Sequence, residues 1–170
     1  PLSIGGQIKV AGFSKQTSLQ GDLAYHQVLE NIGLASSFEG DGLQTKAIGT
    51  PLRGGTFDFN AISDTFLTLA ALVPLLSEPV AITGIAHTRK QETDRVFAMA
   101  TELRKLGQEV EEEEDSLTIH PNREALVEAA EVGIEIQTYE DHRVAMSFAI
   151  LGCADLRGDG QPWITISNPG

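Results

Sequence analysis

Apolar and polar residues follow two kinds of spacing along the chain, which divide it into short strands and short helices. Alternation or brief apolar runs predict strands at residues 7–11, 57–60, 80–84, 134–138 and 163–166. Helical spacing predicts helices at residues 21–33, 64–76, 93–107 and 141–153. Segments 35–45 and 109–119 alternate around polar tips and predict β-hairpins. The polar, alanine-rich residues 122–131 are predicted to form one helical turn or a loop.

These elements recur in the same order along the chain. Gly12 precedes Asp22 by ten residues and Gly84 precedes Asp94 by ten, while the pattern of residues 57–64 returns at 134–141. The repeated unit is strand–helix–strand–helix–hairpin. Residues 57–121 form one full copy, residues 5–50 the second half of a preceding copy, and residues 132–170 the first half of a following one. Such a repeat predicts a pseudo-symmetric mixed α/β (α+β) domain, with apolar helices inside and one-sided sheets outside.

Charge and composition exclude several functional classes. A net charge of -12 over 170 residues argues against nucleic-acid binding, which needs a basic face. The most apolar run, 66–76, is too short to span a bilayer, and no signal peptide is visible, so a cytoplasmic location is expected. The acidic run 109–115 is predicted to be a solvated hairpin tip. The single cysteine, Cys153, is expected to be buried and structural.

Both ends of the sequence suggest a piece of a longer chain. It starts at Pro1 rather than at a methionine, and it stops soon after the apolar run 163–166. We therefore expect one partial domain over residues 1–170.

Two polar clusters stand at predicted helix starts. Residues 86–95 carry His87, Glu92 and Arg95, and residues 139–143 carry His142 and Arg143. Helix N-termini favour anions because their first N–H groups are free and the helix dipole is positive there. In an otherwise acidic chain, cations collected at these two junctions predict an anion site.

Four segments carry a resemblance to a known family. They are Gln20-Gly21-Asp22, Ile62-Ser63-Asp64, Gln91-Glu92-Thr93-Asp94-Arg95 with residues 97–107, and Thr138-Tyr139-Glu140-Asp141-His142-Arg143-Val144-Ala145-Met146. Together, and in this order, they resemble the EPSP synthase family of enolpyruvyl transferases. The resemblance implies a fold of two domains, each an inside-out α/β barrel of three βαβαββ units. This chain would be most of the C-terminal-side domain, without the other domain.

The resemblance also implies an activity. Members transfer the enolpyruvyl group of phosphoenolpyruvate to the 5-hydroxyl of shikimate 3-phosphate and release phosphate, in the shikimate pathway of aromatic amino-acid biosynthesis. The reaction passes through a tetrahedral intermediate in the cleft between the domains and implies no metal and no cofactor. We expect this chain alone to be inactive, since one wall of that cleft is missing.

Two carboxylates match the catalytic positions of the family. Asp64 matches the residue that acts on the substrate hydroxyl, a role worth about 10²–10⁴-fold. Its alternative role is a helix N-cap, as expected also for Asp141 at the equivalent repeat position. Glu92 matches the residue that protonates the methylene carbon of phosphoenolpyruvate. Its alternative is a first-turn glutamate favoured by the helix dipole.

Arg95 and Arg143 match the pair that binds the phosphoenolpyruvate carboxylate through planar, two-pronged hydrogen bonds. The alternative for Arg95 is a local ion pair with Glu92 or Asp94. An arginine at a helix start opposes the helix dipole, so an external anion is the interpretation that explains its place.

Three further residues are expected to contact substrate. His142 matches a family histidine near the phosphate, with packing under Tyr139 as its alternative, and His87 occupies a polar substrate-contacting position. Gln91 departs from the commoner lysine, so either the local positive field is weaker or Arg89 or Lys90 compensates. Two other functions stay open: UDP-N-acetylglucosamine enolpyruvyl transfer, and a non-catalytic binding module on the same fold.

Overall fold

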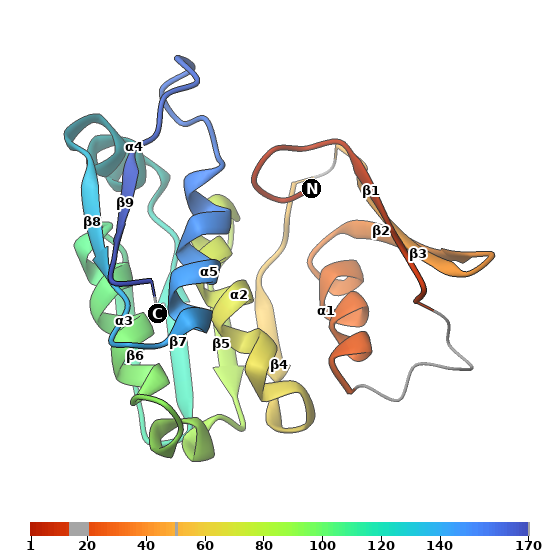
Figure 1. The fold of residues 1–170 in the computed structure, drawn as a ribbon, viewed down its shortest axis with the longest axis horizontal. Coiled ribbons are helices and arrows are strands. Elements are labelled where there is room, and N and C mark those ends of the chain that lie inside the picture. The colour runs from red at the N-terminus through yellow and green to blue at the C-terminus, as the bar shows by residue number, and fades with distance from the viewer. Residues whose placement is uncertain (14–20, 50, 170) are drawn as a thin grey trace.

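The computed structural model describes residues 1–13, 21–49 and 51–169, and it is a mixed α/β structure. Gln20 of the first family segment therefore lies outside the described residues. The N-terminal part consists of β1 (Gln7–Ala11), a 3₁₀ turn η1 (Gly21–Ala24), α1 (Tyr25–Asn31), β2 (Leu34–Glu39) and β3 (Gly42–Ala47). Figure 1 shows this part beside the remainder of the molecule.

The remainder of the chain alternates strands with helices. The elements in order are β4 (Gly55–Asp58), η2 (Asn60–Thr65), α2 (Phe66–Leu72), η3 (Val73–Leu75), β5 (Val80–Thr83), η4 (Ala86–Lys90), α3 (Arg95–Lys105), β6 (Glu109–Glu112), β7 (Ser116–His120), α4 (Arg123–Val132), β8 (Ile134–Gln137), α5 (His142–Gly152) and β9 (Ile164–Ser167). Most predicted elements are present within one to four residues of their expected bounds.

The described strands form three separate sheets whose pairings follow one scheme. The four-stranded sheet has the order β4-β5-β7-β6, with β4 and β5 parallel and the other pairs antiparallel. The three-stranded sheet β1-β3-β2 repeats the antiparallel arrangement of β5-β7-β6. The two-stranded sheet repeats the parallel pair β4-β5 in β8-β9.

The core lies between the sheets and is built mainly by three helices. All residues of α2 except Thr68 are buried, as expected for a helix that is apolar all round. It packs beside α5 and against α3 (Figure 1). The α3 helix is amphipathic instead, with Val96, Met99 and Leu103 buried and Phe97 exposed.

Two glycines fix the turns that place α3. Gly84 follows β5 with φ 75°, and a Cβ there would lie 2.4 Å from Asp58 Oδ1. Gly107 ends the helix with φ 74°, and a Cβ there would lie 2.6 Å from the Cβ of Ala125. Both positions combine a left-handed backbone with close approach of a neighbour, which only glycine accommodates without strain.

Three expectations about local structure are corrected. Residues 64–76 are not one helix, because 3₁₀ turns flank α2 on both sides, the second containing Pro74. Residues 122–131 are more than a turn: they form α4, capped by Asn122 Oδ1 on the Ala125 amide at 3.0 Å and anchored by buried Leu126 and Ala130. Cys153 is exposed rather than buried, because it follows α5 on the outer side of the helix end.

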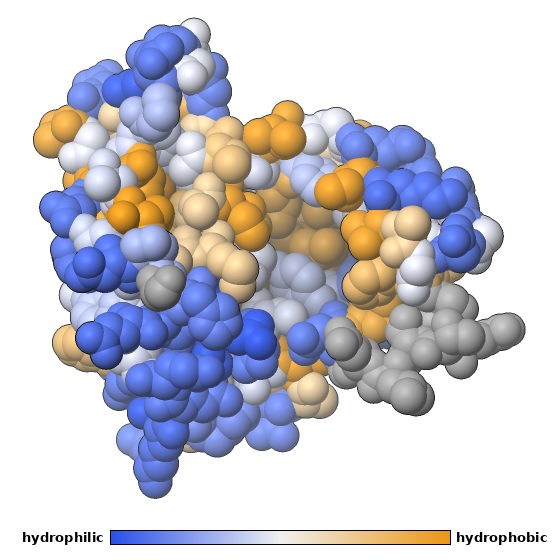
Figure 2. All heavy atoms as spheres, viewed as in Figure 1, coloured by the Kyte–Doolittle hydropathy of each residue, from blue (hydrophilic) through white to orange (hydrophobic). Residues whose placement is uncertain are grey.

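The surface separates into polar and apolar regions. Figure 2 shows hydrophilic residues over the end of the molecule that carries η4 and the β6–β7 hairpin, and apolar residues near α5. On α5, Met146 is 52% and Ile150 39% exposed. Within the described residues, no helix is long and apolar enough to cross a membrane.

Candidate functional site

The two polar clusters of the sequence meet at the starts of α3 and α5. Asp94 caps α3, since its Oδ1 accepts the Phe97 amide at 2.9 Å, and this makes Arg95 the first helical residue. Asp141 caps α5, since its Oδ1 accepts the Arg143 amide at 2.8 Å. The prediction that Asp141 caps its own helix is confirmed. Both helices therefore present an arginine within their first two residues.

Arg95 is almost completely buried, at 1% exposure, and carboxylates from three parts of the chain surround its guanidinium. Its Nε donates to Asp141 Oδ2 at 2.7 Å, its Nη1 to Asp64 Oδ1 at 3.0 Å and its Nη2 to Glu92 Oε2 at 2.6 Å. Nη1 also donates to Gln91 Oε1. The local pair with Glu92 is thus present, but it is one of several partners.

Asp64 joins the two arginines. Its Oδ1 accepts from Arg95 and its Oδ2 lies 2.8 Å from Nη2 of Arg143. The predicted convergence of Arg95 and Arg143 is therefore present in the structure. The N-cap alternative for Asp64 is wrong, because α2 begins after Thr65 with no side-chain capping bond within the described residues. The 3₁₀ turn η2 instead directs Asp64 toward the arginines.

The charges of this cluster do not balance. Two guanidiniums face three carboxylates, those of Asp64, Glu92 and Asp141, which leaves one net negative charge. Asp141 is the fully buried carboxylate of the three. Burial raises the pKa of Asp141, but hydrogen bonds from Arg95 and the Arg143 amide, with the charges of Arg95 and His142, outweigh it and lower that pKa below its ordinary value. This carboxylate therefore stays ionised and holds Arg95 in place.

Access to the cluster comes through its outer members. The side chains of Arg143 and Asp64 are 32% and 35% exposed, and that of Glu92 is 50% exposed. A small anion can therefore approach Arg143 from solvent, whereas Arg95 becomes available only if a carboxylate moves away from it.

The two histidines predicted for the site, His87 and His142, lie at the margin of the arginine–carboxylate cluster. His87, the second residue of η4, has its Nε2 2.9 Å from Oγ of Ser63, the residue before Asp64. His142 is exposed and lines a shallow apolar pocket with Met146, Ala149 and Ile166. The structure brings His87 toward the Asp64 segment, and it leaves His142 on the outer side of the α5 start.

Gln91 has two basic neighbours, Arg89 and Lys90, and the structure treats them differently. Residues 86–90 form the 3₁₀ turn η4 rather than an extended stretch. Arg89 is already engaged: its Nη1 binds Asp94 at 2.9 Å and Glu112 at 3.2 Å, and its Nη2 donates to the Glu113 carbonyl at 2.6 Å. The acidic hairpin tip is exposed as predicted, but Arg89 also ties it to the site. Arg89 is therefore held by Asp94 and the hairpin, and Lys90 is an exposed cation next to Gln91.

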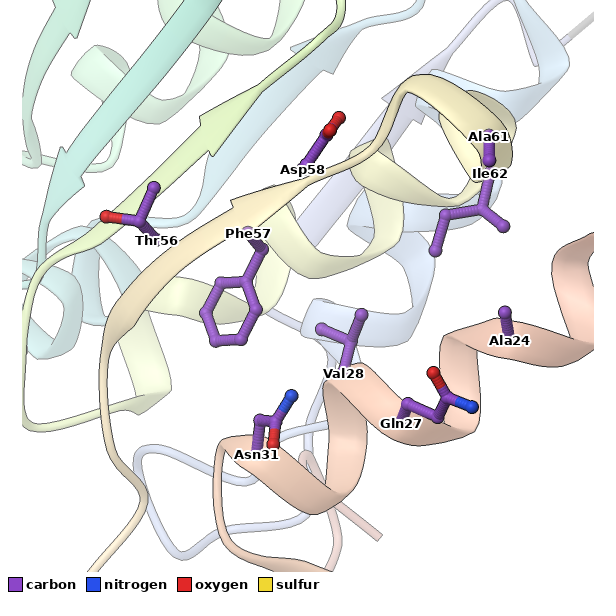
Figure 3. Close-up of a pocket in the computed structure, with 9 residues that line it drawn as sticks. All are labelled: Ala24, Gln27, Val28, Asn31, Thr56, Phe57, Asp58, Ala61 and Ile62. Carbon is purple, nitrogen blue, oxygen red and sulfur yellow. The ribbon is translucent and has the colours of Figure 1, made fainter.

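A separate cavity of about 320 Å³ lies between α1 and the β4–η2 segment (Figure 3). Val28, Phe57 and Ile62 contribute apolar walls, and Gln27 and Asn31 contribute amides from α1. It includes none of the predicted site residues. Across the described residues, no group of three or more histidine, cysteine, aspartate or glutamate side chains is arranged to hold a metal ion.

The sequence missed the second role of Asp141, which holds the Nε of Arg95 in addition to capping α5. Its repeat equivalence to Asp64 was the available signal, since both carboxylates bind the same guanidinium from corresponding places in the chain. The part played by Arg89 in joining η4 to the hairpin had no comparable signal, because it depends on main-chain carbonyls.

The chain is similar to known proteins over nearly its whole length. The pattern of the family EPSP synthase (3-phosphoshikimate 1-carboxyvinyltransferase) matches residues 2–166. Proteins called 3-phosphoshikimate 1-carboxyvinyltransferase from Opitutus terrae and Nostoc punctiforme are 48% and 41% identical over 99% and 98% of the chain. The chain spans 35% of the length of each.

Solved structures support the fold. An EPSP synthase from Acinetobacter baumannii superposes with a TM-score of 0.69 at 19% identity, over 99% of this chain and 39% of that one. The enolpyruvyl transferase NikO from Streptomyces tendae gives 0.58 at 17% identity, over 96% of this chain and 35% of that one. From the family match over residues 2–166, the chain belongs to the EPSP synthase (3-phosphoshikimate 1-carboxyvinyltransferase) family.

Proposed function

We propose that the complete protein carrying this chain transfers the enolpyruvyl group of phosphoenolpyruvate to the 5-hydroxyl of shikimate 3-phosphate, with release of phosphate. Family membership and the names of the relatives support this activity. The observation that carries the site assignment is the convergence of Arg95 and Arg143 on one carboxylate, that of Asp64. A substrate carboxylate has the same charge and the same two-oxygen geometry, so it suits the place between these guanidiniums.

Substrate binding then requires an exchange of partners. With one net negative charge in the cluster, an incoming carboxylate is repelled unless a protein carboxylate moves or takes up a proton. Glu92 is the most exposed of the three, and its release from Arg95 Nη2 frees one arm of the buried guanidinium. Asp141 stays bound to Nε throughout and keeps Arg95 in orientation.

The exchange of Glu92 for the substrate carboxylate on Arg95 also prepares the two proton transfers of the reaction. As the 5-hydroxyl oxygen bonds to C2 of phosphoenolpyruvate, Asp64 takes the hydroxyl proton and Glu92 gives a proton to the methylene carbon. The tetrahedral adduct then loses phosphate, which takes the proton held by Asp64, while a proton of the new methyl group returns to Glu92, and this forms the double bond of the enolpyruvyl ether. His142, His87 and Gln91 are assigned to substrate contacts around this centre. No step calls for a metal or a cofactor.

We also propose that the chain is one partial domain of a two-domain protein. The repeat units are residues 5–50, 57–121 and 132–170, and the matching pairings of β5-β7-β6 with β1-β3-β2, and of β4-β5 with β8-β9, support them. Residues 50 and 170, which end two of these units, lie outside the described residues. Helices inside and sheets outside, as in an inside-out barrel, agree with the burial of α2. The other domain supplies the second wall of the cleft, and the complete protein works in the cytoplasm.

Phosphate release by the complete protein tests the activity. We expect release that requires both phosphoenolpyruvate and shikimate 3-phosphate, and a fall in kcat of about 10²–10⁴-fold for Asp64→Asn and for Glu92→Gln. Asp41→Asn and Glu128→Gln, which change exposed carboxylates away from the cluster, are the matched controls and should leave kcat unchanged.

The other outcomes identify the alternatives. Release that depends on UDP-N-acetylglucosamine instead of shikimate 3-phosphate would assign the protein to that enolpyruvyl transfer. A folded complete protein that binds phosphoenolpyruvate without any turnover would be a binding module, and the catalytic proposal would be wrong.

A further inference from the structure

The segment between β8 and α5 has an uncommon backbone. Tyr139 and Glu140 have φ of 56° and 60°, and the Asp141 amide donates to the Thr138 carbonyl at 2.9 Å. Two successive residues with positive φ inside such a bond are the pattern of a type I′ turn, which favours glycine, asparagine or aspartate at both positions. A tyrosine and a glutamate therefore hold this conformation only with support from their surroundings.

The support comes from a buried carboxylate on α3. Glu102 is fully buried, and its Oε1 accepts from the Tyr139 hydroxyl at 2.7 Å. Its Oε2 accepts from the Gln137 amide at 3.2 Å and from Lys105 Nζ at 2.8 Å. Phe97, which precedes Glu102 on α3, packs edge-on against the Tyr139 ring, with 6.3 Å between the ring centroids. Glu102 thus binds both the end of β8 and Tyr139, the first of the two residues with positive φ.

The α3 helix consequently holds the 137–141 segment at two points along its length. Glu102 binds Gln137 and Tyr139, and Arg95 binds Asp141 at 2.7 Å. In Figure 1 the segment passes from β8 across α3 to the start of α5. Because Asp141 caps α5, the turn sets where that helix begins and so where Arg143 meets Asp64.

Packing alone does not explain why the buried side chain at position 102 is a carboxylate. An apolar side chain would fill a buried helix position as well, whereas a buried carboxylate loses hydration that its partners must replace. Here three donors replace it, and two of them belong to the segment that leads to the site. Burial, then the hydrogen bond to Glu102, raises the pKa of Tyr139 to about 12, so its hydroxyl remains a donor at neutral pH.

We propose that Glu102 and Tyr139 are positioning residues, whose hydrogen bond holds the left-handed 138–141 turn and thereby sets Arg143 in place for the substrate carboxylate. The proposal rests on the proposed function, in that Arg143 binds phosphoenolpyruvate. Neither residue touches the substrate.

The test removes the Tyr139 hydroxyl and compares the change with a matched one. The chain has two tyrosines, and the other, Tyr25, has a buried hydroxyl with no hydrogen-bond partner within the described residues. In the complete protein, Tyr139→Phe should raise the KM for phosphoenolpyruvate about tenfold and leave the KM for shikimate 3-phosphate unchanged. Glu102→Gln should act in the same direction, and Tyr25→Phe should change neither KM.

A second measurement, amide hydrogen exchange, reports on the stability of the 138–141 turn itself. In the 170-residue chain, Tyr139→Phe should speed hydrogen exchange of the amides of residues 139–143 about tenfold without a similar rise in α2. Adding Glu140→Gly, which adopts positive φ freely, should restore slow exchange and a low KM for phosphoenolpyruvate.

Two results would overturn the positioning role: an unchanged KM for phosphoenolpyruvate in Tyr139→Phe, or a uniform rise in exchange over the whole chain. Absence of enolpyruvyl transfer by the unmodified complete protein would count against the proposed function instead. The exchange measurement would still decide whether Glu102 and Tyr139 hold the turn.

Discussion

Arg95 is the residue on which the candidate site depends. It is a buried cation at a helix start, where the helix dipole opposes it, and carboxylates from η2, the segment before α3 and the α5 cap neutralise it. Loss of any one of them leaves a donor of the buried guanidinium without its partner, which is costly. The arrangement fixes the guanidinium before any substrate arrives, so binding does not have to order it.

Gln91 provides a prediction at this scale. Its Oε1 accepts from Arg95 Nη1, which also binds Asp64, and it brings no charge to a cluster that is net negative. Gln91→Lys would free that donor and add a positive charge. We expect the complete protein to keep or improve its affinity for phosphoenolpyruvate, measured by titration calorimetry.

Lys90→Gln is the matched control, because it changes an exposed neighbour by one charge in the opposite sense. It should leave the affinity unchanged or lower it slightly. A large loss of affinity in Gln91→Lys would instead mean that the pocket is built around the neutral amide.

At the scale of elements, two capped helices and one turn set the geometry. Asp94 and Asp141 define where α3 and α5 begin, and η2 rather than a continuous helix carries Asp64. Through Arg95 and Glu102, α3 binds the approach to α5, so hydrogen bonds connect the two helix starts. The site is therefore held by elements rather than by loops alone.

The cap of α5 predicts a dependence on acid. The pKa of Asp141 is lower in the folded chain than its ordinary value, so its stabilisation is fully present above that value and is lost as pH falls through the folded pKa. At pH 7, Asp141→Asn should lower the free energy of unfolding by about 1.5–3 kcal/mol, since it removes charged hydrogen bonds.

Urea unfolding at several pH values measures this effect. The difference between the native chain and Asp141→Asn should shrink as pH falls below about 4, the ordinary range of aspartate. Asp41→Asn, at the exposed tip of the β2–β3 hairpin, should show little difference at any pH. A constant difference for Asp141→Asn down to acid pH would contradict the assigned role.

At the scale of the whole molecule, the described strands form three separate sheets, and the helices are buried to different extents. The α2 helix is enclosed, whereas Met146 and Ile150 leave an apolar strip of α5 in contact with solvent. Figure 2 shows apolar surface in this region. Exposed apolar patches mark surfaces that associate. Since the chain spans 35% of its relatives, we propose that the complete protein covers this strip.

The 170-residue chain by itself should therefore self-associate as its concentration rises. Sedimentation velocity over a concentration series measures this, and Met146→Glu should reduce the association. Val132→Glu, which charges an exposed apolar residue at the end of α4, is the control and should have a smaller effect. A chain that stays monomeric at all concentrations would show that the apolar strip does not drive self-association.

Much of the fold follows from local signals in the sequence. Alternation predicted β1 and both hairpins, and the predicted cap Asp141 marked the start of α5. These features depend on residues only a few positions apart, so a sequence pattern carries them. Residues 122–131 were misjudged because the helix α4 depends partly on the burial of Leu126 and Ala130 by the core.

By itself, the sequence determined the order of most strands and helices and the placing of an arginine near the start of each of two helices. Only the tertiary structure decided that Asp64 bridges those arginines instead of capping α2, that Asp141 holds Arg95, and that Cys153 faces solvent. The physical reason is distance along the chain. The bonds from Arg95 to Asp64 and Asp141 join residues 31 and 46 positions apart, and only the packing of α2, α3 and α5 brings them together.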